Sequence, residues 1–137
     1  MRNPKWHRDE IILTLELYYD LESGRMNSGS KEVVELSELL NKLPIHTIRP
    51  DAQKFRNPNG VALKLGNFKF FDPDYNGTGL KGGSKLDEEV FHEFYENLSQ
   101  LRSIANNIKS AVNNKVLVDE LYEISNDSES ESVFVKE

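Results

Sequence analysis

Residues 56–80, RNPNGVALKLGNFKFFDPDYNGTGL, contain the clearest helix start and stop in this chain. Asn57 suits the N-cap position, and Pro58 suits the first helical position because its missing N–H has no helical partner there. A residue that precedes a proline is biased away from helix, so Asp72 before Pro73 marks the end. We therefore predict a helix over residues 57–71. A loop should follow, since residues 75–85 hold four of the chain's eight glycines.

Apolar side chains repeat at helical spacing on both sides of this segment. Residues 8–21 are predicted to form the first helix, and a second follows Ser30, which can cap it, and ends before Pro44. Ser84 and Asp87 have the spacing of a capping box, which predicts a long helix over residues 86–111. We expect an all-α fold, a helix-turn-helix-like three-helix core braced by a long fourth helix. The predicted units are a domain over 1–112, a short helix within 113–124 and an acidic tail over 125–137.

Composition narrows the possible functions. The chain has 137 residues, enough for one domain with its own core. It has no cysteine, and its three histidines are scattered, which argues against a thiol nucleophile, a zinc finger, or any metal or cofactor. The acidic residues Asp87, Glu88 and Glu89 stand where a helix N-terminus favours carboxylates, so we expect capping and not catalysis. No apolar signal sequence or membrane span is evident, so we expect a cytoplasmic protein. Since no catalytic group stands out, we expect that this chain is not an enzyme.

The charge is unevenly distributed. The formal net charge is −6, yet residues 43–86 carry seven basic and three acidic side chains. Polyanions are bound by local patches and not by the average charge of a chain. This middle third is therefore where we expect a nucleic-acid partner, although such lysines can also simply solvate a surface.

A helical projection of residues 57–71 places apolar side chains around most of the circumference, Leu63 and Phe70 included. A narrow strip of Gly60, Lys64 and Asn67 remains. A mostly buried helix with one polar strip is what a helix-turn-helix unit presents to the major groove. The alternative is that Lys64 and Asn67 simply face solvent on an amphipathic helix.

The remaining candidates surround this strip. Cations before and after the helix are expected to contact phosphates, and asparagine, lysine and tyrosine side chains are expected to approach the bases. Trp6 is expected to pack in the core, with base stacking as the alternative. The candidate DNA-binding residues are Arg49, Lys54, Arg56, Asn57, Asn59, Lys64, Asn67, Lys69, Tyr75, Lys81 and Lys85.

Five short strings of this sequence resemble one known family. They are W-x-R-D-E-x-I-L-x-L-E-L-Y at 6–18, RNPNGVALKLGNF at 56–68, DP at 72–73, GL at 79–80 and DEEVFHEF at 87–94. Together they resemble the N-terminal domain of McrA-like HNH endonucleases, the 5-methylcytosine-specific restriction protein A group. The resemblance spans roughly residues 5–110. It implies a domain that engages DNA, often modified DNA, on behalf of a C-terminal HNH nuclease domain. The HNH histidine pair and the zinc-binding cysteines of that family are absent from this sequence.

The function expected from the sequence is binding of double-stranded DNA, with reading of a modified base implied by the resemblance alone. The nuclease domain would belong to a longer parent protein. A protein-interaction or dimerisation module that does not bind DNA is the alternative. A modification other than 5-methylcytosine is a further alternative, and the sequence does not choose between them.

Overall fold

The computed structural model describes residues 2–114, which form five α-helices and one 3₁₀ turn. The helices are α1 (Arg8–Asp20), α2 (Lys31–Lys42), α3 (Pro58–Phe71), α4 (Lys85–Phe94) and α5 (Leu98–Asn113), with η1 (Ser23–Arg25) between α1 and α2. The predicted all-α class is confirmed. The helix-turn-helix arrangement of the first three helices stays a prediction, and residues 115–137, with the expected tail and most of the expected short helix, lie outside the described residues.

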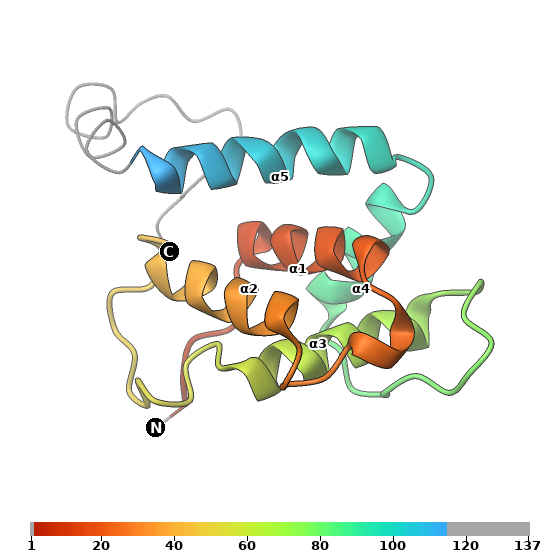
Figure 1. Ribbon diagram of the computed structural model, residues 1–137, viewed down its shortest axis with the longest axis horizontal. Coiled ribbons are helices and arrows are strands. Elements are labelled where there is room, and N and C mark those ends of the chain that lie inside the picture. The colour runs from red at the N-terminus through yellow and green to blue at the C-terminus, as the bar shows by residue number, and fades with distance from the viewer. Residues whose placement is uncertain (1, 115–137) are drawn as a thin grey trace.

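Helix α1 is the centre of the fold. It contacts each of the other four helices, and α5 lies along one side of it while α2 and α3 lie on the other (Figure 1). Eight consecutive residues, Asp9 to Glu16, are buried. A helix surrounded in this way buries its polar as well as its apolar side chains, and those polar groups need internal partners.

Most helix boundaries agree with the sequence signals. Asn57 caps α3 by accepting a hydrogen bond from the Gly60 N–H at 2.7 Å, and Pro58 is the first helical residue. Ser84 and Asp87 form the predicted capping box of α4. Ser30 stands at the N-cap of α2, but its side chain makes no capping bond because the hydroxyl donates to the Arg25 carbonyl instead.

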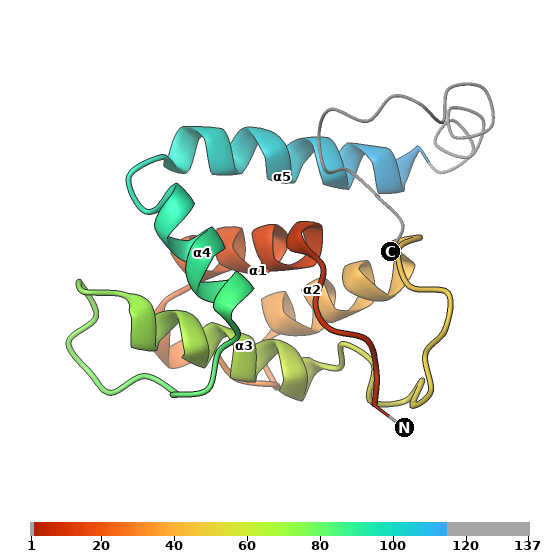
Figure 2. The ribbon, with the colours of Figure 1, turned by 180° about the vertical axis from the view of Figure 1, so that it is seen from behind.

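The predicted single helix over residues 86–111 is wrong. The chain breaks at Tyr95–Asn97, where the Asn97 N–H bonds to the Phe94 carbonyl at 2.9 Å and the helical pattern ends. Helix α4 packs against α1 and α3, whereas α5 turns to run along α1 (Figure 2). Phe94 and Leu101, which lie on either side of the break, are both fully buried and are seven residues apart, as in a continuous helix. The apolar periodicity of the sequence therefore gives no sign of the break.

Two cations of α5 form ion pairs with α1. Lys109 Nζ lies 2.5 Å from Glu16 Oε1, and Arg102 contacts Asp20 through two hydrogen bonds of 2.7 and 3.0 Å. Below them, Leu101, Ala105 and Ile108 are completely buried. Apolar burial therefore supplies most of the attachment, and the partly exposed ion pairs add little.

Candidate nucleic-acid interface

Arg56, expected to contact phosphate, is buried in the core. Its Nε lies 2.7 Å from Glu10 Oε2 and its Nη2 lies 3.0 Å from Glu10 Oε1, with both side chains at most 4% exposed. The same Nη2 donates to the carbonyls of Pro4 and Lys5. A guanidinium bonded on these sides and shielded from water is not available to a nucleic acid, so this expectation is corrected.

The backbone of Arg56 is also unusual. Its φ of 45° lies in the left-handed region, which a residue with a side chain rarely adopts. The Arg56 carbonyl accepts a hydrogen bond from the Ser37 hydroxyl at 2.8 Å, and its guanidinium stacks 4.3 Å from the centroid of the Phe55 ring. These contacts hold the turn that leads into α3. Arg56 is thus a structural residue whose bonds compensate for a disfavoured backbone conformation.

Arg49 also forms hydrogen bonds within the protein. It donates to three backbone carbonyls, those of Asn41, Leu43 and His46, at 3.1 to 3.3 Å. Its guanidinium lies 4.2 Å from the centroid of the Phe55 ring. The loop before α3 is therefore stiffened by Arg49, and this side chain too is corrected from a phosphate contact to an internal one.

The expected exposed strip on α3 is covered. Lys64 Nζ lies 2.7 Å from Asp87 Oδ2, and Lys64 is 11% exposed while Asp87 is fully buried. Asn67, only 8% exposed, donates through Nδ2 to the Leu80 carbonyl at 2.7 Å. Residues 72–84 fold back over α3 and engage Asn67 through Leu80, while the first turn of α4 engages Lys64 through Asp87. The prediction that Lys64 and Asn67 form an exposed polar strip is therefore wrong.

Two glycines allow this segment to lie so close. A Cβ on Gly79 would overlap the backbone nitrogen of Phe70, and one on Gly66 would lie 3.1 Å from the Leu80 side chain. The Leu80 N–H bonds to the Gly66 carbonyl at 2.9 Å. Gly79 thus permits a close backbone approach, and Gly82, at φ 123°, uses the positive φ that glycine permits.

The exposed edge of α3 lies elsewhere on the helix and is largely apolar. Leu63 is 51% and Phe70 49% exposed, although the sequence projection placed both among buried positions. Asn59 precedes them on the same side of the helix and is also exposed. Leu80, 43% exposed, lies beside Gly66. We call Asn59, Leu63, Phe70 and Leu80 the α3 edge.

Exposed lysines lie in the segments before and after α3. Lys54, Lys81 and Lys85 are exposed, and none forms an ion pair with another residue in the range 2–114. Lys69 is half-buried, with its Nζ 5.1 Å from the centroid of the Tyr75 ring. In both ribbon views residues 44–57 run down one side of the molecule to the edge where α3 lies, and residues 72–84 return along that edge (Figures 1 and 2). Of the cations expected at the interface, these four keep their charge at the surface.

Three contacts connect the N-terminal segment to this surface. Asn3 exchanges two hydrogen bonds of 3.0 Å with Asp51, and the Asp51 carboxylate accepts from the Lys54 N–H. Trp6 is half-buried against the core, as expected, and the Lys64 ammonium lies 4.8 Å from the centroid of its ring. Residues 3–6 thus bridge the loop before α3 to α3 itself.

The buried acids are what the sequence interpretation missed. Glu10 accepts from Arg56 and from the His7 N–H, and its Oε1 lies 2.9 Å from His46 Nε2. Asp87 accepts from Lys64. The available signal was Glu10 beside Ile11 and Ile12, an acid within a helix that is apolar on more than one side. Nothing comparable in the sequence pairs Asp87 with Lys64, since 23 positions separate them.

Other kinds of site find little support in residues 2–114. Within that range no group of three or more histidine and acidic side chains could hold a metal ion, and no helix is long and apolar enough to cross a membrane. His92 is exposed on α4, where its nearest charged neighbour is Glu88 at 3.8 Å. Comparison of the chain with protein-family models, with curated proteins and with solved structures found no match.

Proposed function

We propose that this domain binds double-stranded DNA through the α3 edge and the exposed lysines before and after α3. The observation that carries the proposal is that Lys54, Lys81 and Lys85 remain exposed and without an ion-pair partner in residues 2–114, in a chain whose net charge is −6. Unpaired surface lysines attract phosphates through release of counterions. The local positive potential around these lysines, and not the net charge of the chain, would thus determine which partner binds.

The α3 edge supplies the groups that would meet the bases. Asn59 can donate to and accept from an adenine edge. Leu63 and Phe70 present apolar surface, which can contact the methyl group of thymine or of a methylated cytosine in the major groove. Reading of a modified base on behalf of an HNH nuclease domain in a longer parent protein remains part of this proposal, and it derives from the family resemblance.

Binding is tested by fluorescence anisotropy of a labelled duplex over a range of salt concentrations. Each phosphate contact contributes about 0.9 to the slope of log K against log salt. The double variant Lys81→Ala, Lys85→Ala should therefore lower the slope by about 1.8. The matched control is Lys31→Ala, Lys42→Ala, which removes the same charge from α2 and should leave the slope nearly unchanged. Binding without salt dependence, or equal losses in both variants, would contradict the proposal.

The contribution of the α3 edge is tested with duplexes that carry unmodified cytosine, 5-methylcytosine, 5-hydroxymethylcytosine, N6-methyladenine or a phosphorothioate. The double variant Leu63→Ser, Phe70→Ser should lose preference among these duplexes while it keeps the salt slope. Leu98→Ser is the matched control, since Leu98 is an exposed leucine on a different helix. Equal affinity of the unaltered protein for all duplexes would leave a DNA-binding domain that does not read modification.

The alternative function, a protein-interaction module, is favoured by a different observation. Helices α1 and α2 border a groove with an apolar floor and acidic sides. This groove does not belong to the α3 edge, and the two functions do not exclude each other.

A further inference from the structure

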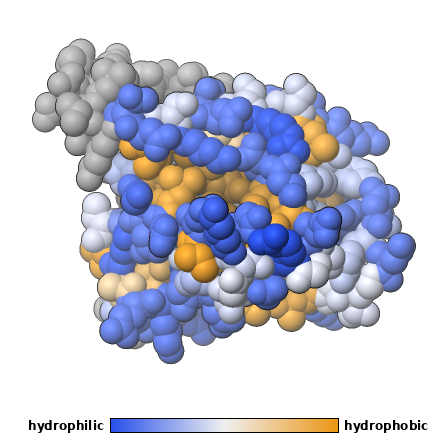
Figure 3. Space-filling view, in the orientation of Figure 1, coloured by the Kyte–Doolittle hydropathy of each residue, from blue (hydrophilic) through white to orange (hydrophobic). Residues whose placement is uncertain are grey.

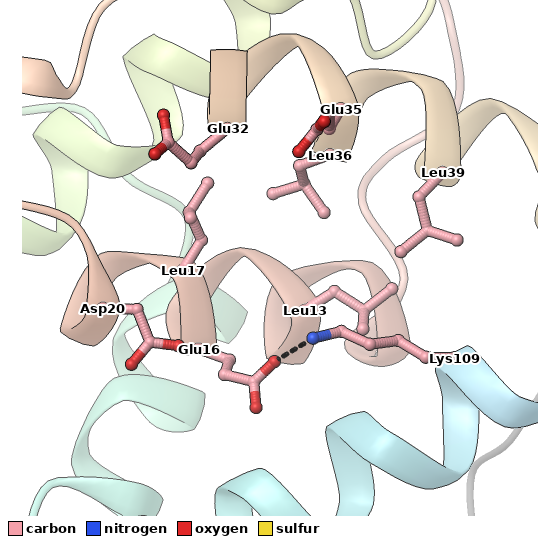
Figure 4. A pocket seen from close by; sticks show the side chains of 9 residues that line it. All are labelled: Leu13, Glu16, Leu17, Asp20, Glu32, Glu35, Leu36, Leu39 and Lys109. Atoms are coloured by element: carbon pink, nitrogen blue, oxygen red, sulfur yellow. Dashed lines mark hydrogen bonds and ion pairs between the residues drawn. The ribbon is translucent and has the colours of Figure 1, made fainter. Parts of the chain in front are cut away.

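The groove is formed by three helices. It encloses about 280 Å³ and appears as an apolar hollow between hydrophilic rims in the space-filling view (Figure 3). Helix α1 contributes Leu13, Glu16, Leu17 and Asp20, helix α2 contributes Glu32, Glu35, Leu36 and Leu39, and helix α5 contributes Lys109. Leu17, Leu36 and Leu39 point into the space between α1 and α2 (Figure 4). Glu32 and Glu35 lie on the α2 side of these leucines, and Glu16 and Asp20 lie on the α1 side (Figure 4).

The floor of the groove is continuous with the core. Leu13 and Leu36 are 1% and 6% exposed and belong to the main apolar cluster. Leu17 and Leu39 pack against the same cluster but are only half-buried. Two half-buried leucines above two buried ones leave an apolar strip that no described segment covers, and strips of this kind with polar rims mark interaction sites.

The sides of the groove are negative. Four carboxylates line it against one ammonium group, Lys109, which is bonded to Glu16 at 2.5 Å. The side chains of Glu35, Asp20 and Glu32 are 59%, 48% and 39% exposed. The cations that pair with these three do not line the groove. Exposed ion pairs contribute at most about 1 kcal/mol, so an incoming cation can replace them at small cost.

We propose that this groove docks an amphipathic helical segment of another protein that carries lysine or arginine beside its apolar stripe. Such a segment places apolar side chains at i, i+3 or i+4, and i+7 against Leu17 and Leu39, with its cations facing Glu35 and Asp20. The negative charge of the groove argues against two other occupants, DNA and the chain's own C-terminal residues. DNA is a polyanion, and residues 115–137 carry seven acidic and two basic side chains, so both would be repelled by the rim.

The experiment uses the full 137-residue chain and three fluorescein-labelled peptides. One peptide is built from leucine and lysine in helical period, the second replaces each lysine by glutamate, and the third is a scrambled version of the first. Anisotropy measures affinity, and NMR of leucine methyl groups locates the contact. We expect the leucine–lysine peptide alone to bind and to shift the methyl signals of Leu17 and Leu39.

Three single-residue variants test whether the peptide binds in the groove. Glu35→Lys reverses an exposed charge on the groove and should weaken binding at least about fivefold. Glu38→Lys, the same change at an exposed position of α2 that does not line the groove, should change affinity by less than about twofold. Leu39→Ser should also weaken binding, with circular dichroism showing that the helices are retained.

Three results would overturn the proposal. Equal binding of the glutamate peptide would remove the argument from charge. Equal effects of Glu35→Lys and Glu38→Lys would place the contact elsewhere. A shift of the Leu17 methyl signals on Leu121→Asp, without any peptide, would show that the chain's own C-terminal segment covers the groove.

Discussion

The Lys64 ammonium lies 2.7 Å from the Asp87 carboxylate, and this pair joins α3 to the start of α4. The same Asp87 oxygen accepts the N–H of Ser84 at 2.8 Å as part of the capping box. The buried Asp87 carboxylate therefore caps α4 and also binds Lys64, the lysine that the sequence analysis predicted to contact DNA. Most of the polar residues that stood out in residues 56–80 therefore stabilise the fold. The surface available to a partner is the neighbouring α3 edge.

Replacement of Lys64 by methionine should destabilise the protein strongly. The Asp87 carboxylate would stay buried without its cation, which costs about 3 to 5 kcal/mol in the free energy of unfolding. Urea denaturation followed by far-UV circular dichroism measures the loss. Lys85→Met is the control, since Lys85 is exposed and its replacement should change the unfolding free energy by less than about 0.5 kcal/mol. A small effect at Lys64 would mean that the pair is not formed in solution.

Replacement of Arg56 by lysine should also destabilise the fold, although the charge is retained. A lysine cannot reproduce the two-point contact with Glu10 together with the bonds to the Pro4 and Lys5 carbonyls. We expect a loss of about 3 kcal/mol in the free energy of unfolding, measured by chemical denaturation. In the DNA assay, any Arg56→Lys protein that stays folded should keep the salt slope of the unaltered chain. A smaller slope of log K against log salt would instead indicate that Arg56 contacts DNA.

Replacement of Gly79 by alanine should detach the segment that covers α3. The added Cβ would overlap the Phe70 backbone nitrogen, and backbone on both sides leaves no flexible side chain to move away. Overpacking of this kind costs about 1 to 3 kcal/mol. Gly24→Ala is the matched control, because nothing lies within 4 Å of its added Cβ. Thermal melts of the two variants should differ clearly, and similar melting temperatures would contradict the close approach at Gly79.

The protein should lose stability at alkaline pH through three tyrosines whose pKa is raised by folding. Burial raises the pKa of Tyr18, and its hydrogen bond of 2.6 Å to Asp72 adds to the rise. Burial also raises the pKa of Tyr19 to about 12, and a hydrogen bond to Asp74 raises that of Tyr95 to about 12. A pKa raised by folding stabilises the protein below the ordinary value of 10.0, and this stability falls as the pH rises from 10.0 towards 12.

Tyrosinate absorbance measured against pH tests this expectation. In the folded protein these three tyrosines should ionise above the pH at which they do so in denaturant. Tyr18→Phe should reduce the difference between the two titrations. Coincident titration curves for folded and denatured protein would show that the three hydroxyls are freely solvated.

The sequence by itself determined the all-α class, the bounds of α3 and the caps at Asn57 and Ser84, because these depend on residues within one turn of each other. It did not reveal the break at Tyr95–Asn97, since the apolar spacing continued across it, and only the different packing partners of α4 and α5 decided their directions. Tertiary structure also decided which side of α3 is exposed. Helical periodicity shows that a helix has faces. The contacts of Lys64 with Asp87 and of Asn67 with Leu80, between residues far apart in the chain, decide that this side of α3 is covered while Leu63 and Phe70 stay exposed.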